Sequence, residues 1–115
     1  MEIGSGVVIG DRCRIQAMVY IPAGVMIGND VFIGPRVTFL NDKYPPNKDF
    51  DGTVIVDDEG CIGGGALILP GVRLNWGCKI GAGAVVTRDV PSLITVVGVP
   101  AKEFSIDKPR SGRRV

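Results

Sequence analysis

Bulky apolar residues recur at every sixth position along most of this chain. The series is Ile3, Ile9, Ile15, Ile21, Ile27, Ile33 and Phe39, then Val56, Ile62, Ile68, Leu74, Ile80 and Val86. A second series of small or β-branched residues follows four positions later, from Val7 to Val37 and from Gly60 to Val90. Each residue of the second series therefore lies two positions before the next bulky residue. Residues two apart in a strand project from one face, so both series point to the same side of the strand. Residues spaced by six would point in several directions around a helix of 3.6 residues per turn and could not form one apolar face. The pattern therefore predicts short strands joined by corners.

Glycine marks the position after many of the aliphatic residues, as expected for tight corners. These glycines are Gly4, Gly10, Gly28, Gly34, Gly63 and Gly81. Self-similarity at a fixed short period is typical of a stacked β-helix, in which each rung buries its side chains only against its neighbours. Six complete hexads precede one interruption and six follow it. With three hexads in a triangular coil, we expect an all-β parallel β-helix of about four coils.

Composition is compatible with one small domain. The chain has 115 residues, a mass of 12.2 kDa and a net charge of +1. Its apolar runs fall short of the ~20 residues that a membrane span requires, and its start lacks the pattern of a signal peptide, so we expect a soluble, cytoplasmic protein. Positive charge concentrates in the tail without interleaved aromatic residues, which argues against nucleic-acid binding. The three cysteines have no metal-ligand spacing; Cys13 and Cys78 fall at inward positions and Cys61 at an outward one.

One polar, proline-containing segment interrupts the repeat. Phe39 and Val56 are 17 residues apart, and the sequence between them predicts an external loop at about residues 40–55. Such a loop in a regular fold is a place to build specificity, although a surface insertion without function is the alternative. We therefore expect a β-helix domain at residues 1–102, carrying this loop, and a flexible basic tail at 103–115.

Two C-terminal motifs resemble those of the hexapeptide-repeat acyltransferases, which form left-handed parallel β-helices. The motifs are Ile-Gly-Ala-Gly-Ala-Val-Val-Thr-Arg-Asp-Val-Pro at residues 80–91 and Val-Gly-Val-Pro-Ala-Lys at residues 97–102. Together with the hexads and the position of the loop, the resemblance covers residues 3–102. The left hand is implied by the resemblance alone, because the general preference of β crossovers is right-handed.

The resemblance implies a homotrimer with active sites at subunit interfaces and an acyl-CoA donor, acetyl-CoA in the first instance, in the groove between neighbouring helices. Small corner residues would let the narrow pantetheine arm approach the backbone. The cofactor-binding residues assigned in this way are Gly64, Gly65, Ala66, Gly83 and Ala84, with Arg88 and Lys102 as cations for the CoA phosphates. Corner geometry alone is the other explanation for the glycines.

The loop sequence Asn-Asp-Lys-Tyr-Pro at residues 41–45 is similar to that of N-acetyltransferases acting on amino groups of nucleotide-linked sugars. This similarity implies that Asn41 and Asp42 are catalytic, with Asn41 fixing the acceptor amine and Asp42 holding or accepting an amine proton. Lys43 and Tyr44 would contact the sugar or the diphosphate. An arginine often follows the proline in that group, whereas Pro46 and Asn47 follow it here. Asp42 is also compatible with a purely turn-forming role.

The chain contains no histidine. Relatives that acetylate hydroxyl groups commonly use a histidine base, and the γ-class carbonic anhydrases of this fold hold zinc with three histidines, so we expect neither chemistry and no metal. A neutral amine attacks a thioester without first becoming an alkoxide, and positioning can suffice. The sequence therefore predicts acetyl transfer from acetyl-CoA to the amine of a nucleotide-linked amino sugar. Two alternatives stay open: a different small amine acceptor, and a non-catalytic β-helix module.

Overall fold

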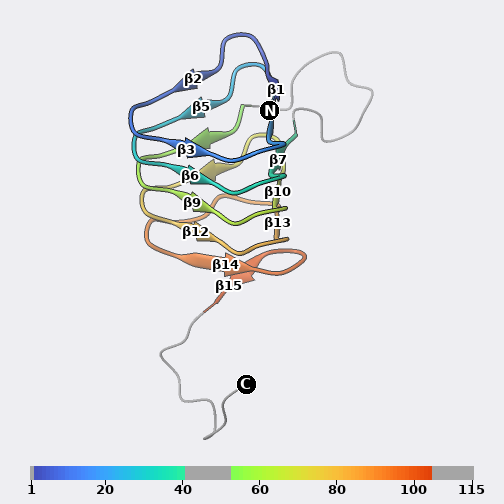
Figure 1. The fold of residues 1–115 in the computed structure, drawn as a ribbon. Helices are drawn as coiled ribbons and strands as arrows, with labels where there is room; N and C mark the ends of the chain where they lie inside the picture. The colour runs from blue at the N-terminus through green and yellow to red at the C-terminus, as the bar shows by residue number, and fades with distance from the viewer. Residues whose placement is uncertain (1, 41–52, 105–115) are drawn as a thin grey trace, which may run out of the picture.

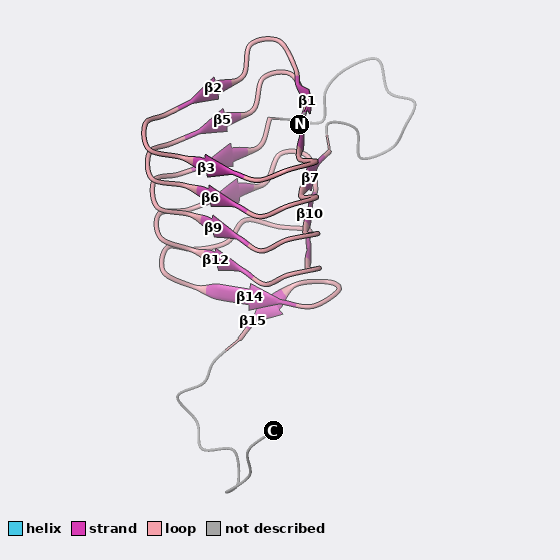
Figure 2. Cartoon of the chain, in the orientation of Figure 1, coloured by secondary structure: helices cyan, strands magenta, loops and turns pink. Residues whose placement is uncertain are grey.

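The computed structural model describes residues 2–40 and 53–104. Every regular element in these two ranges is a short strand, and successive strands wrap around one axis as a left-handed parallel β-helix (Figures 1 and 2). The predicted fold class and hand are confirmed. Within the same ranges there is no helix of the length and apolar character that crossing a bilayer requires.

Three sheets form the walls of the helix, and each successive strand belongs to the next wall. Sheet A contains β1 (Glu2–Ile3), β4 (Tyr20–Ile21), β7 (Thr38–Phe39), β10 (Leu67–Ile68) and β13 (Val85–Val86). Sheet B contains β2 (Val8–Ile9), β5 (Met26–Ile27), β8 (Ile55–Val56) and β11 (Arg73–Leu74). Sheet C contains β3 (Arg14–Ile15), β6 (Phe32–Ile33), β9 (Cys61–Ile62), β12 (Lys79–Ile80), β14 (Thr95–Val97) and β15 (Lys102–Glu103).

The helix has about five turns, and the prediction of about four coils was too low. In the regular coils, partners such as Leu67 and Val85 lie three hexads apart. The segment after Val90, which lies beyond the twelve counted hexads, adds β14 beneath β12. The spacing between paired residues becomes shorter before β14, because Val90 bridges to Leu74, only sixteen positions earlier. The corner formed by Thr87, Arg88 and Asp89 is therefore two residues shorter than its counterparts, and hexad counting ends there.

The two periodic series fill the interior, as the strand geometry requires. The bulky series is fully buried in the middle coils, and the small series packs between its members, Cys78 among them. Burial raises the pKa of the Cys78 thiol to about 11, since the thiolate would lie among aliphatic side chains. Cys61 faces outward on β9 and is half-buried, in agreement with its predicted outward position. In the first coil the inward residues Ile9, Cys13 and Ile15 are only half-buried, because among the described residues no strand lies over them.

The C-terminal end is closed by a reversal of the chain. Strand β15 runs antiparallel to β14, pairing Lys102 with Val97 and Glu103 with Val96. The intervening turn also satisfies sheet A, because Val85 donates to the Gly98 carbonyl at 3.0 Å and Ala101 donates to the Val85 carbonyl at 2.9 Å. This cap covers the last strands of two walls.

Candidate functional site

The corner between sheets C and A changes character along the helix axis. Its third residue has a positive φ in four successive coils: 63° at Met18, 64° at Arg36, 76° at Gly65 and 73° at Gly83. A left-handed backbone costs an L-residue about 1–2 kcal/mol, yet the first two coils accept it. We call residues 63–65 and 81–83 the glycine corner. Its two left-handed positions carry no side chain, whereas the same positions above carry long ones.

Internal packing does not explain the absence of side chains at these two positions. A Cβ atom built on Gly83 would meet no atom within 4 Å, and one built on Gly65 would meet only the Gly83 backbone nitrogen, at 4.0 Å. Gly64 differs, because its Cβ would lie 3.2 Å from the Pro35 carbonyl oxygen in the coil above. Gly64 is thus required by stacking, while Gly65 and Gly83 form an exposed backbone strip where the left-handed backbone, and not a neighbouring atom, favours glycine.

The two alanines assigned to the donor site lie elsewhere. Ala66 and Ala84 are buried in the bore at 1% and 0% exposure. Their methyl groups pack in the core and are not available to a ligand on the outer surface. Only the glycines among the small assigned residues present backbone at the corner.

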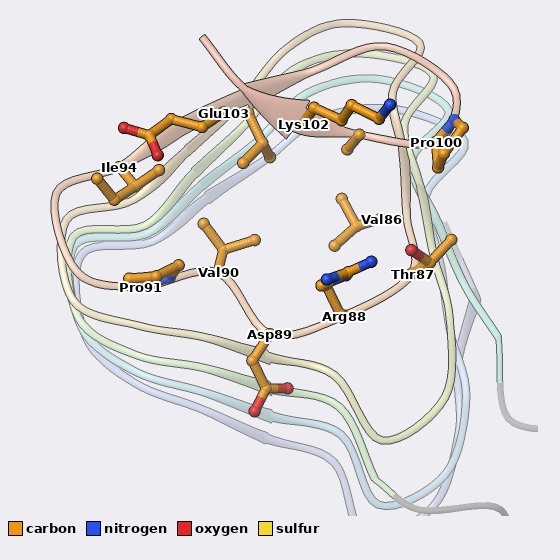
Figure 3. A pocket seen from close by; sticks show the side chains of 12 residues that line it. Val86, Thr87, Arg88, Asp89, Val90, Pro91, Ile94, Pro100, Lys102 and Glu103 are labelled. Atoms are coloured by element: carbon orange, nitrogen blue, oxygen red, sulfur yellow. The ribbon is translucent and has the colours of Figure 1, made fainter. Parts of the chain in front are cut away.

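Arg88 and Lys102 come together at the C-terminal end of the helix. Both line a pocket of about 470 Å³ whose wall is built from the shortened corner, β14 and β15 (Figure 3). Val86, Val90 and Val96 form its apolar floor. Among the residues that the structure describes, neither cation takes part in an ion pair. The sequence interpretation missed Thr87, Pro91 and Glu103 as lining residues, because they adjoin the pocket only after the corner shortens and β15 turns back.

The aspartate of the Thr-Arg-Asp motif has a structural role. The Asp89 carboxylate accepts a hydrogen bond from the Arg73 backbone N–H at 2.8 Å, one coil above. The Arg73 guanidinium donates to both oxygens of Asp57 at 3.1 Å, and this hydrogen-bonded pairing raises the pKa of Arg73. Asp58 accepts from the Asn29 backbone N–H at 2.8 Å. In the acidic run at residues 57–59, Asp58 therefore stabilises a corner of the coil above and Asp57 forms an ion pair with Arg73.

The four acceptor-site residues expected in the loop, Asn41, Asp42, Lys43 and Tyr44, lie outside the described residues. The place where their loop leaves the helix is described. Leu40, the last residue before it, donates its backbone N–H to the Ile68 carbonyl at 2.9 Å, and β7 pairs with β10. Because β10 begins directly after the corner that contains Gly65, the loop origin and the glycine corner lie at opposite ends of the same two-residue strands of sheet A.

Two family descriptions match the chain on either side of the loop. "Bacterial transferase hexapeptide (six repeats)" matches residues 6–41, and "Hexapeptide repeat of succinyl-transferase" matches residues 53–88. The two matches together cover more than half of the chain. The chain belongs to the hexapeptide-repeat acyltransferase family. The resemblance inferred from the sequence is thereby confirmed.

Relatives within the family differ in acceptor. A serine acetyltransferase of Buchnera aphidicola is 41% identical over 110 residues, which are 90% of this chain and 35% of that protein. A galactoside acetyltransferase solved with coenzyme A is 26% identical with a TM-score of 0.75, covering 88% of this chain and 55% of the other. A histidine-to-alanine variant of the GDP-perosamine N-acetyltransferase of Caulobacter crescentus, solved with CoA and GDP-perosamine, is 27% identical with a TM-score of 0.65, covering 90% of this chain and 44% of the other. This hexapeptide-repeat chain spans about two fifths or less of the length of the curated relatives it matches.

Proposed function

We propose that this hexapeptide-repeat protein is an acetyl-CoA-dependent N-acetyltransferase whose donor lies along the glycine corner. The observation that carries the proposal is that Gly65 and Gly83 lack side chains where the fold leaves room for them. A pantetheine arm needs a narrow approach to backbone N–H and C=O groups, and a Cβ on this strip would obstruct it. The coenzyme A in the related galactoside enzyme supports the choice of donor.

The charged end of the donor would lie toward the C-terminal end of the helix. Arg88 and Lys102 line one pocket there and are free of ion pairs within the described ranges. Two cations that line one pocket at the C-terminal end of the helix suit the phosphates of a ligand whose slender middle follows the glycine corner. Phosphate contact by these two side chains is the role we propose for them.

The acceptor that we propose is the amino group of a nucleotide-linked sugar. The relative solved with GDP-perosamine supports this class of acceptor, although the histidine-to-alanine substitution in that structure shows that it natively contains a histidine that this chain lacks. The preference for an amine over a hydroxyl rests on chemistry, because a neutral amine attacks without first becoming an alkoxide. The neutral amine would attack the thioester carbonyl carbon, forming the C–N bond. Collapse of the tetrahedral intermediate would break the C–S bond, and the CoA thiolate would take the proton lost by the nitrogen. Asn41 would orient the amine and Asp42 would hold its proton, with Lys43 and Tyr44 contacting the sugar or diphosphate.

The proposed assembly is a homotrimer with each donor groove between two subunits. Outward apolar side chains support lateral association, because Val8 and Met26 lie in register on sheet B with 56% and 48% of their surface exposed. Light scattering that gave a mass near 12.2 kDa at micromolar concentration would contradict this assembly.

Methionine substitutions test the donor strip directly. Met18 already adopts the required backbone at the equivalent corner position, so Gly65→Met and Gly83→Met should fold while obstructing the strip. We expect each to weaken CoA binding by roughly tenfold or more in isothermal titration calorimetry. Gly6→Met is the matched control, since Gly6 has a φ of 72° and its nearest atom also lies at 4.0 Å, but at another corner. If both test variants bound CoA as tightly as the parent, the donor could not lie along this corner.

A further inference from the structure

The shortened corner at residues 87–89 is followed by a residue whose register is fixed by hydrogen bonds. Val90 donates its N–H to the Arg73 carbonyl at 3.0 Å and accepts from the Asn75 N–H at 3.0 Å. The Asn75 side-chain amide also donates to the Val90 carbonyl, at 2.8 Å. These bonds set Val90 beside Leu74, so Val90 takes the inward place in the last coil that Leu74 takes in the coil above.

This register gives Arg88 and Asp89 the alternation of a strand. Counted back from Val90, Asp89 takes the outward place below Arg73, and Arg88 takes the inward place below Val72. The Arg88 side chain accordingly points into the pocket and that of Asp89 points away from it (Figure 3). A corner of regular length would leave both residues at turn positions. The missing two residues therefore direct a cation toward the end of the bore.

A side chain replaces one backbone rung beside Arg88. In the coil above, the equivalent N–H group, that of Ile55, donates to the Val72 carbonyl at 3.1 Å. The next bond of a regular parallel ladder would join the Arg73 N–H to the Arg88 carbonyl. The Arg73 N–H donates to the Asp89 carboxylate instead, at 2.8 Å. This carboxylate thus ties the shortened corner to β11 at the residue that follows Arg88.

We propose that Asp89 is a positioning residue, which holds Arg88 toward the pocket by way of the Arg73 N–H. The inference rests on the proposed function, in which Arg88 contacts the CoA phosphates. A long side chain loses entropy when it is held at a ligand, and a fixed backbone reduces that loss. Without the carboxylate, the described bonds between this corner and β11 begin only at Val90, and Arg88 is no longer held in its inward place.

Alanine substitutions of the two residues, alone and together, test the positioning. Arg88→Ala should weaken CoA binding by roughly fivefold in isothermal titration calorimetry. Asp89→Ala should weaken it by a similar factor in the parent and have no further effect in Arg88→Ala, because both act through one contact. Asp89→Asn should bind CoA as the parent does, since its side-chain oxygen can still accept from Arg73. This variant also removes the negative charge, which separates charge from positioning.

Two further variants serve as controls. Asp58→Ala removes the same kind of bond at another corner, because Asp58 accepts from the Asn29 N–H, also at 2.8 Å. It should leave CoA binding unchanged. Lys102→Ala should weaken CoA binding by the same factor with and without Asp89→Ala, because Lys102 is held by the pairing of β15 with β14 and not by the shortened corner.

Nitrogen-15 NMR relaxation of the Arg88 side chain gives a readout that needs no ligand. Asp89→Ala should increase its motion on the picosecond to nanosecond timescale, and Asp89→Asn should not. Parental motion of Arg88 in Asp89→Ala, or an effect of Asp89→Ala on CoA binding that persists in full in Arg88→Ala, would overturn the positioning. If Arg88→Ala leaves CoA binding unchanged, the proposed phosphate contact fails, and the NMR comparison alone decides whether Asp89 positions Arg88.

Discussion

The two ends of this β-helix finish the same core in different ways. At the C-terminal end the last inward residues Val86, Val90 and Val96 are at most 7% exposed, because a shortened corner and the antiparallel strand β15 close over them. The first described coil keeps the regular repeat, and its inward residues Ile3, Ile9 and Ile15 remain partly exposed within the described ranges. The repeat thus builds a core by stacking but does not terminate it. Termination requires residues that depart from the repeat, and here those departures also form the pocket with Arg88 and Lys102.

The largest expected effect is the difference in stability between a variant with a charge in the middle of the bore and one with the same charge in the first coil. Ile33→Asp would set a carboxylate between covered rungs, and we expect it to abolish cooperative folding, since an unpaired buried charge costs several kcal/mol. Ile3→Asp should cost on the order of 1 kcal/mol, because Ile3 is already 47% exposed. Thermal unfolding monitored by circular dichroism compares the two. Equal melting temperatures would show that the end coil is as well covered as the middle.

A smaller effect is expected from Cys78 at alkaline pH. Burial raises the pKa of this thiol from 9.0 to about 11, so between these values the folded chain retains a proton that the unfolded chain loses. Stability should therefore be complete below pH 9 and fall as pH rises toward 11, by about 2 kcal/mol from this group. Urea unfolding of the parent and of Cys78→Ala across this pH range measures the contribution of this thiol to the free energy of unfolding. Cys13→Ala at the open end should keep the decline; if Cys78→Ala keeps it as well, the thiol is not its source.

The smallest expected effect concerns the exposed ion pair between the first two coils. Arg12 donates to both carboxylate oxygens of Asp30, at 2.8 and 3.0 Å, and this hydrogen bonding lowers the pKa of Asp30. The pair therefore stabilises the fold at neutral pH, and its contribution is lost as pH falls through the lowered pKa of Asp30. Exposed pairs contribute little, so Arg12→Ala should barely change the melting temperature while the NMR titration of Asp30 shifts upward. An unchanged titration would mean that the pair does not form in solution.

The regular part of the fold could be predicted because its information is local and repeated. Ile33 and Ile68 are buried for the same reason, which is that a strand residue at this phase of the period points into the bore. The shortened corner could not be counted from the period, because Thr87, Arg88 and Asp89 bring Val90 beside Leu74 two positions early. The fifth turn followed from that shift, and the return of β15 depended on contacts between distant segments.

In the candidate site, too, some features could be predicted from the local sequence and others depended on contacts between distant segments. Lys102 and Arg88 were assigned from motifs, and their convergence on one pocket depends on the cap rather than on either motif. Ala66 and Ala84 were assigned from their small size, yet the period itself places them inward, and that signal was present in the sequence. The distinction between Gly64 and Gly65 required coordinates, because only the coil above shows which glycine is crowded.

The central claim is acetyl transfer to an amine without a histidine base, and thiol release from acetyl-CoA across pH tests it most directly. With an amino-sugar nucleotide as acceptor, the rate should rise with pH until the acceptor amine is deprotonated, without an enzyme step near pH 6–7. Asn41→Ala should lower this rate while CoA binding stays nearly unchanged. Equal turnover of the matching hydroxyl sugar nucleotide, or an Asn41→Ala variant as active as the parent, would contradict the account.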